Sequence, residues 1–398
     1  MPGSTLHLAA LTATSCLGRG LAATLDALLQ SRSGLTPCQF ETARLSTFVG
    51  EVAGVDAVEL PAPLRRFACR NNRLAELALG ADRFIESVER SAVRHGRHRI
   101  GVFIGTSTAG ILETELAYRQ RDAVGALPAS FDYAATHNSF SPADYVRRRL
   151  GLTGPAAAVS CACASSAKAF ASARRMIDAG LIDCAVVGGV DSLCLTTLYG
   201  FHSLQLTSSK PCRPFDAERD GLSIGEAAAF ALLERTPTSL GADEILLQGV
   251  GESSDAHHMS APHPEGLGAR LAMQAALADA ELAAQSIDYV NLHGTATPSN
   301  DRAESLAVCH VFGAATLCSS TKGATGHTLG AAGALEAVVA ALALRHGFVP
   351  GGTGTRRVDP ELRAAYLTAN RHDAPKHVLS NSFGFGGVNC SLIFGRAG

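Results

Sequence analysis

Apolar residues in this chain gather in short runs that alternate with longer Ala- and Leu-rich stretches. Two of the longer stretches, residues 164–179 and 330–346, have apolar positions at helical spacing and are each followed by a glycine that can end a helix. The alternation predicts an α/β protein with mostly parallel sheets covered by helices. The short runs have the length of buried strands and are found at residues 100–104, 185–187, 245–250, 289–292 and 378–379.

One local pattern occurs twice along the chain. In the first half, an apolar run ending near residue 160 leads through small residues to Cys163 and a helix. In the second half, residues 317–320 lead through glycines to His327 and another Ala-rich helix. Recurring turn chemistry would give the same pattern, but a duplication is the interpretation we favour. A polar interruption at residues 236–242 then predicts two halves, 1–240 and 241–398.

Composition narrows the class of protein. The chain has 46% hydrophobic and 18% charged residues and a net charge of −2, which favours a large buried core and gives no overall attraction to nucleic acid or acidic membranes. Its eleven cysteines have no regular spacing, which indicates reduced thiols in a cytoplasmic protein. We expect neither a signal peptide nor a membrane-spanning segment, because no basic residue precedes Arg19 and no apolar run of about 18 residues is evident.

Cys163 is the first candidate for chemistry. It precedes a predicted helix in the segment VSCACASS, and a thiol at a helix N-terminus is expected to have a lowered pKa. For a lone cysteine, a buried structural role is the more common explanation. Cys161 competes for the part of nucleophile, because strand alternation points both side chains the same way.

His293 ends a predicted strand in NLHGTATPSND, where an imidazole is exposed over the sheet and Thr295 and Thr297 offer hydroxyls to a ligand. A helix cap beside a satisfied histidine would explain the same residues. Further on, Lys322 and His327 lie in the glycine-rich segment STKGATGHTLG.

A buried Lys322 would need a carboxylate beside it, and Glu304 is the candidate; the alternative is a solvated lysine on a flexible connector. The segment does not have the order of a phosphate-binding P-loop. Near the C-terminus, NSFGFGGVN places Phe383 and Phe385 among glycines, which suits a mobile gate as well as a plain turn. The spacing of cysteines and histidines does not favour a metal site.

Taken together these segments resemble the β-ketoacyl–acyl carrier protein synthases, the elongating condensing enzymes of the thiolase fold, over nearly the full length. Cys163 in SCACASS matches the nucleophile motif of that family, and His293 in HGTATPSND and His327 in KGATGH match its two catalytic histidines. The set of one cysteine and two histidines differs from the second cysteine of thiolases and the Cys-His-Asn set of initiating synthases. Further matches are Lys322 with Glu304 as the buried supporting pair and Phe385 in GFGGVN as the gate.

The resemblance implies a layered α/β/α/β/α sandwich built from two thiolase-like halves. It also implies that Cys163 becomes acylated, that the backbone N–H groups of Cys163 and Phe385 hold the oxyanion, and that His293 and His327 stabilise the enolate formed when malonyl–acyl carrier protein loses carbon dioxide. No metal or organic cofactor is needed for this reaction. The remaining implied positions are the phosphopantetheine tunnel (Thr295, Thr297, Ser260) and the substrate pocket (Thr108, Phe201, Phe383).

Partners follow from the same resemblance. They are an acyl carrier protein and a second subunit, either identical or a homologous chain-length factor, paired through the strand at residues 183–190. The basic residues Arg65, Arg66, Arg70 and Arg73 could attract the carrier protein or form an ordinary solvated helix face. The polar Thr108, and His257 where an aromatic residue is common, favour a specialised polyketide or aryl polyene route over housekeeping fatty acid synthesis. A silent chain-length factor is the alternative function, which the intact Cys163 argues against.

Overall fold

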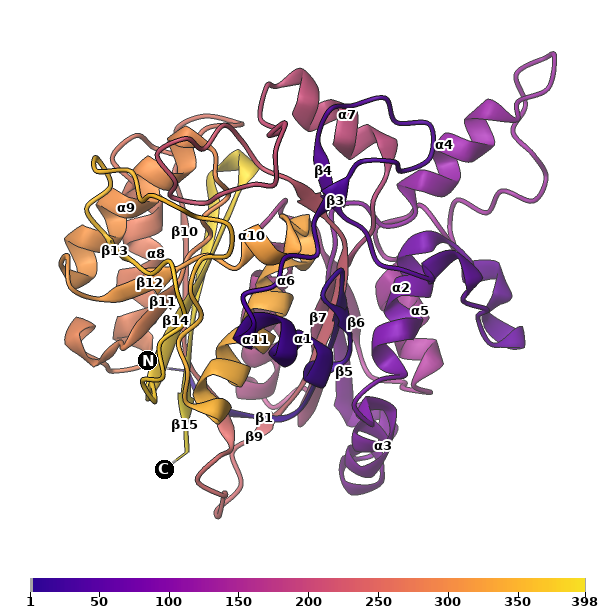
Figure 1. Cartoon of the computed structure of the whole chain (residues 1–398). Helices are drawn as coiled ribbons and strands as arrows, with labels where there is room; N and C mark the ends of the chain where they lie inside the picture. The colour runs from indigo at the N-terminus through magenta and orange to yellow at the C-terminus, as the bar shows by residue number, and fades with distance from the viewer. Residues whose placement is uncertain (1–2, 398) are drawn as a thin grey trace.

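The computed structural model describes residues 3–397 and arranges them in alternating layers of helices and strands (Figure 1). Helices α6 (Ser165–Asp178) and α11 (Ala332–His346) lie between two sets of strands, one mainly from each half of the chain. Other helices cover the outer face of each set. The predicted α/β/α/β/α sandwich is therefore confirmed.

The two halves have the same strand order and the same strand directions. In each half the first two pairs of strands are parallel and the next two pairs are antiparallel. This repetition confirms the duplication predicted from the two strand–turn–helix segments. The strands in matching order are, in the first half, β6 (Ala156–Val159), β5 (Ile100–Gly105), β7 (Cys184–Asp191), β9 (Ala227–Arg235) and β1 (Leu6–Ser15), and in the second, β12 (Leu317–Ser319), β11 (Tyr289–Asn291), β14 (His377–Gly384), β15 (Val388–Arg396) and β10 (Ile245–Ser254).

The remaining elements extend or cover this framework. A short pairing of β1 with β10 joins the halves, and β13 (Ala365–Tyr366) and β2 (Gly18–Arg19) add to the joined sheet. The small sheet consists of β3 (Thr36–Pro37), β4 (Phe48–Gly50) and β8 (Ile224–Gly225). The other helices are α1 (Leu21–Leu29), α2 (Arg70–Leu79), α3 (Phe84–His95), α4 (Ile111–Arg119), α5 (Ser141–Arg149), α7 (Leu195–Ser203), α8 (Leu267–Asp279), α9 (Pro298–Phe312) and α10 (Lys322–Thr325), with 3₁₀ turns at Val55–Ala57, Ala62–Phe67, Arg97–Arg99, Ala284–Ser286, Leu329–Ala331 and Phe385–Gly387.

Every strand and helix expected from the apolar pattern is present, but β7 and β14 are each eight residues long where three and two residues were expected. The pattern did not reveal β1, β9 and β15, the long strands that make most of the antiparallel pairs. Eight of the nine residues of β9 are buried, so it lacks the alternation of a half-exposed strand. The large sheet is therefore mixed and not mostly parallel: its parallel pairs are confined to the outer strands of each half, and β4 and β8 of the small sheet also pair in parallel.

The central helix corrects one prediction. Residues Leu329–His346 are long and apolar enough to span a membrane, although none was expected, but 89% of this stretch is buried inside the protein. Helix α11 contacts strands of both halves and packs closely on α6. A Cβ atom on Gly333 would lie 2.8 Å from the backbone nitrogen of Ala167, so this contact requires a glycine. The apolar character of the helix is explained by its place in the core.

The place of β7 corrects the predicted subunit contact. Apart from Asp183, residues 183–190 fall in β7, which lies between β5 and β9 and is buried throughout, so it cannot pair with another chain. The outermost strand of the first half is β6, whose residues are all half-buried. This strand leads directly to Cys163, so the open sheet edge and the nucleophile are neighbours in the sequence.

Candidate active site

Cys163 lies in the turn between β6 and α6, where the chain makes a sharp bend. Ala162 has a φ of +47°, a value that residues with a side chain rarely adopt, and the Cys161 N–H donates to Ser165 Oγ at 2.9 Å. The bend turns the buried thiol of Cys163 into a cavity, with its sulfur 2.9 Å from His327 Nε2. Cys161 is half-buried and does not line this cavity. Geometry thus selects Cys163, while all eleven cysteines are free thiols.

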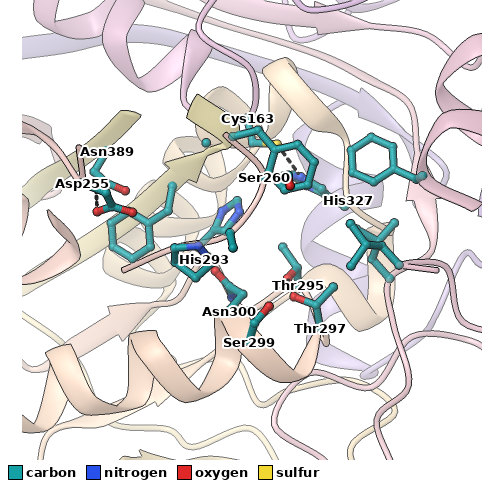
Figure 2. Close-up of a pocket in the computed structure, with 18 residues that line it drawn as sticks. Cys163, Asp255, Ser260, His293, Thr295, Thr297, Ser299, Asn300, His327 and Asn389 are labelled. Atoms are coloured by element: carbon teal, nitrogen blue, oxygen red, sulfur yellow. Dashed lines mark hydrogen bonds between the residues drawn. The ribbon is translucent and has the colours of Figure 1, made fainter. Parts of the chain in front are cut away.

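The two predicted histidines reach the same cavity from the second half of the chain. His293 follows β11, and His327 lies in the turn after α10, where its backbone N–H donates to Ser223 O at 2.7 Å. The imidazole rings meet edge to face with centroids 5.2 Å apart. Figure 2 shows the thiol and the two rings facing one another, and their ligand atoms all lie within 4.8 Å of one another. The structure therefore unites three groups that are up to 164 residues apart in the sequence.

The carboxylate partner of Lys322 was predicted wrongly. The Lys322 ammonium pairs with Glu336 of α11, and both side chains are almost fully buried. Glu304 instead accepts backbone N–H groups of His293 at 2.8 Å and Gly294 at 2.7 Å. Because Glu304 lies in α9 beneath the end of β11, its carboxylate holds the backbone that carries His293. Both glutamates support the site, but only Glu336 neutralises the lysine.

Burial sets the protonation of the three reactive groups. It lowers the pKa of His293 and of His327 well below the usual range, and the Lys322 ammonium acts in the same direction. Burial also raises the pKa of the Cys163 thiol to about 12, although Lys322 opposes this. The expected lowering of the thiol pKa by the helix N-terminus is therefore outweighed by burial. All three groups rest neutral, so the thiol can donate its proton to His327 Nε2.

The cavity is narrow and is lined by aromatic rings. Its volume of about 60 Å³ has room for a few water molecules but not for a long acyl chain. Phe385 stacks on Phe201 with centroids 5.5 Å apart, and Phe383 lies 5.9 Å from His293. All three line the cavity, as predicted for the gate and the substrate pocket. An acyl group can enter only if some of these rings move.

Polar residues line one wall of the cavity, and most of them were predicted. Thr295 and Thr297 contribute hydroxyls 3.0 Å apart, and Ser260 lines the same space. Figure 2 places the threonines at the start of α9, beside two lining residues that the sequence argument did not select, Ser299 and Asn300. Both residues belong to the segment NLHGTATPSND that carries His293, so their place in the sequence could have predicted that they line the cavity.

The structure places Thr108 behind the site instead of in its lining. It is fully buried, and its hydroxyl donates to Asp191 Oδ1 at 2.8 Å. Sequence reasoning also overlooked a bond across the cavity wall, in which Asn389 Nδ2 donates to Asp255 Oδ1 at 2.9 Å. The residues next to Asp191 and Asp255 in the sequence do not indicate that these carboxylates would bind Thr108 and Asn389.

The predicted basic cluster is divided by the structure. Arg70 is 3% exposed and pairs with Glu226 at 2.6 Å, so it holds the fold together and cannot meet a partner. Arg65 and Arg66 are exposed, and Arg73 is half-buried. Arg66 pairs with Asp132 at 2.9 Å, so within this cluster only Arg65 and Arg73 have no ion-pair partner among residues 3–397.

A thiol and two neutral imidazoles at this spacing could also hold a metal ion. Metal-binding histidines almost always donate their second ring N–H to a protein group. Within residues 3–397, neither His293 Nδ1 nor His327 Nδ1 has a hydrogen-bond partner, and the Lys322 ammonium lies close enough to lower both histidine pKa values. The site therefore fits proton transfer and hydrogen bonding better than a resident metal.

Comparison with known proteins gives matches along almost the whole chain. Residues 9–239 match the family described as "Beta-ketoacyl synthase, N-terminal domain", and residues 245–355 match its C-terminal domain. A 3-oxoacyl-[acyl-carrier-protein] synthase 2 from Vibrio cholerae is 32% identical over 403 residues, covering 96% of each chain. The mitochondrial 3-oxoacyl-[acyl-carrier-protein] synthase of Arabidopsis thaliana is 41% identical over 271 residues, which are 63% of this chain and 58% of that protein.

A solved structure gives a match at full length. A ketosynthase from Xenorhabdus doucetiae, determined in complex with its chain length factor, superimposes with a TM-score of 0.89 and 38% identity. The match covers 99% of this chain and 98% of that one.

Proposed function

Given that this chain belongs to the β-ketoacyl synthase family and is a condensing acyltransferase, we propose that Cys163, His293 and His327 divide its reaction among them. The enzyme elongates an acyl chain by decarboxylative condensation, in fatty acid or polyketide-type synthesis. The observation that carries the division of roles is the convergence of one thiol and two neutral imidazoles on one narrow cavity.

In the first step, the Cys163 sulfur attacks the thioester carbon of the acyl carrier. The thiol proton passes to His327 Nε2, 2.9 Å away, and from there to the phosphopantetheine sulfur as the carrier leaves. The backbone N–H groups of Phe385 and Cys163 both lower the pKa of the Cys163 thiol, and they are the donors that hold the tetrahedral oxyanion. The products are acyl-Cys163 and a free carrier thiol.

In the second step, a malonyl thioester loses carbon dioxide and leaves an enolate. His293 and His327, being neutral, can each donate an N–H to the enolate oxygen, and Lys322 favours that neutral state. The enolate carbon attacks the acyl carbon, the bond to Cys163 breaks, and the released thiolate takes up a proton through His327. Each turnover thus forms one carbon–carbon bond and consumes one proton.

Thr295, Thr297 and Ser260 line the approach and suit the amides and hydroxyl of a phosphopantetheine arm. The exposed Arg65 supplies positive charge for an acidic carrier protein, whereas the charge of Arg66 is shared with Asp132. The chemistry needs no metal or organic cofactor.

A homologous second subunit is the partner we propose, because the solved relative was determined with its chain length factor. In this chain the open edge of β6 is the surface available for such pairing. A specialised polyketide-type route fits this assembly better than housekeeping synthesis.

The test is the mass of the intact protein after mixing with a panel of acyl carrier protein thioesters, with and without a co-expressed homologous subunit. We expect an acyl adduct on Cys163 that malonyl carrier protein discharges, and no adduct on Cys163→Ala. An unchanged adduct on Cys163→Ala would refute the assigned nucleophile, and the absence of any adduct in both preparations would refute the proposed acyl intermediate.

A further inference from the structure

A buried carboxylate, Asp191, lies at the end of β7 with no part in the steps above. It is 0% exposed, and within residues 3–397 no lysine or arginine forms an ion pair with it. The carboxylate instead accepts six donor groups. These are the backbone N–H groups of Ser107 (2.8 Å), Thr108 (2.8 Å) and Gly330 (2.5 Å) and the hydroxyls of Thr106 (2.8 Å), Ser107 (2.5 Å) and Thr108 (2.8 Å).

These bonds join the two halves of the molecule. The turn at residues 106–108 follows β5 in the half that carries Cys163, whereas Gly330 follows His327 by three residues in the other half. The contact is tight, since a Cβ atom on Gly330 would lie 2.7 Å from Asp191 Oδ2 and 2.9 Å from Ser107 N. Asp191 therefore adds a side-chain link between the first half and the turn that carries His327, beside the backbone bonds of His327 with Ser223 and Gly225.

We propose that Asp191 is a positioning residue of this active site, which fixes His327 against Cys163 and places a negative charge behind the thiol. This inference rests on the proposed function only where it predicts an effect of Asp191 on turnover. The carboxylate touches no substrate atom and acts through the turn at Gly330 and through its field.

The charges around the thiol support the electrostatic part. Lys322 of α10 lowers the pKa of Cys163, but Glu336 of α11 pairs with that lysine. His293 and His327 are neutral. The Asp191 charge raises the thiol pKa, so it acts with burial to keep the thiol protonated and unreactive until a thioester arrives.

The first experiment measures the rate at which iodoacetamide alkylates Cys163 as a function of pH, with Cys163 and Cys161 resolved by tandem mass spectrometry. Asp191→Asn removes the charge, so the thiolate should form at lower pH. We expect alkylation about tenfold faster or more below the wild-type midpoint, because one pKa unit changes the thiolate fraction tenfold. This readout needs neither carrier protein nor partner subunit, so it is independent of the proposed function.

The matched control is Ser107→Ala, which removes one hydroxyl from the carboxylate and leaves its charge. Its alkylation profile should coincide with that of the wild type. An equal shift in Ser107→Ala would show that loosening of the turn, and not the charge, is responsible. An unshifted profile in Asp191→Asn would overturn the electrostatic role directly.

Turnover tests the positioning role. Asp191→Glu keeps the charge but is longer by one methylene group, so it should displace Gly330 and lower kcat about tenfold or more while KM and the alkylation profile stay near wild type. Asp191→Glu can also be used to test the positioning role if Asp191→Asn does not fold. Wild-type kcat in Asp191→Glu, or a change confined to KM, would refute the assignment.

Discussion

The two halves of this molecule have the same strand order but contribute different reactive groups to the site. In the first half, the turn after β6 carries the nucleophile Cys163. In the second, the turn after β12 leads to His327, which faces that nucleophile as its proton acceptor. The charges that act on the thiol come from both halves, since Asp191 of the first has no ion-pair partner among residues 3–397 and Lys322 of the second is paired with Glu336. The two copies of the same strand arrangement thus place a nucleophile and its proton acceptor on opposite sides of the contact between the halves.

The largest effect should come from removing the contribution of the first half. Cys163→Ala should abolish the acyl adduct and the condensation, whereas Cys161→Ala should retain both, because Cys161 lies outside the cavity. Intact-protein mass with acyl carrier protein measures the adduct. Acylation that survives in Cys163→Ala but fails in Cys161→Ala would reverse the assignment.

Removing either imidazole of the second half should separate the two steps. His327→Ala should slow acylation about a hundredfold or more, because it removes the proton acceptor of the thiol. His293→Ala should form the adduct normally but lose about a hundredfold in condensation, since one enolate donor is gone. Single-turnover measurements of each step distinguish the variants, and equal loss of acylation in both would contradict the division of roles.

The ion pair of the second half should matter for stability as well. Glu336→Gln leaves Lys322 buried without a counter-charge, which should cost about 3–5 kcal/mol in the free energy of unfolding. Denaturant unfolding gives this value. The double variant Lys322→Met, Glu336→Leu is the control, because it removes both charges and should regain most of the loss. A double variant as unstable as Glu336→Gln would show that packing, not charge, is at stake.

A smaller effect should appear as a pH dependence. Burial raises the pKa of Glu304 to about 7 from an ordinary 4.5, so the folded state binds its proton more tightly than the unfolded chain. Protonated Glu304 therefore adds to the free energy of unfolding at low pH, and this addition is lost as pH rises from about 4.5 to about 7. Its size is about 3 kcal/mol, and Glu304→Gln should remove it. Thermal unfolding across this range tests the sign, and parallel curves for variant and wild type would contradict it.

The smallest effect should come from the contact that crosses between the halves at the gate. Phe201→Ala removes the ring that stacks on Phe385, an interaction worth about 0.5–1.5 kcal/mol beyond its buried area. We expect a several-fold faster reaction of Cys163 with a bulky maleimide and little change with iodoacetamide. Leu204→Ala, at an exposed site near Phe201 in the sequence, is the matched control. Equal acceleration with both reagents would argue against a gate.

The reactive groups were predictable because each is a polar residue among small neighbours at a strand-to-helix turn. The partner of Lys322 was not, since Glu304 and Glu336 are chemically equivalent and only the packing of α11 brings one to the lysine. A signal existed, because Glu336 is the only charged residue between Ala332 and Leu344, and a charge in a buried helix must be paired.

The strands that were not predicted also depend on packing that the local sequence does not show. An Ala-rich strand buried on both faces, such as β9, has neither strand alternation nor a clear helical stripe. Asp191 likewise has no local pattern, since its donors come from turns 83 or more residues away. Long-range pairing of this kind is decided by topology.

The central position of α11 has a consequence for how the chain is made. This helix belongs to the second half, yet it fills the core of the first by contacting β7 and β9. During synthesis, the first 240 residues emerge before α11 exists, so α6 can cover β5 and β7 but the inner face of β9 must wait uncovered. The two halves are therefore units of ancestry and not of folding, and a truncated first half should need a chaperone to stay out of aggregates.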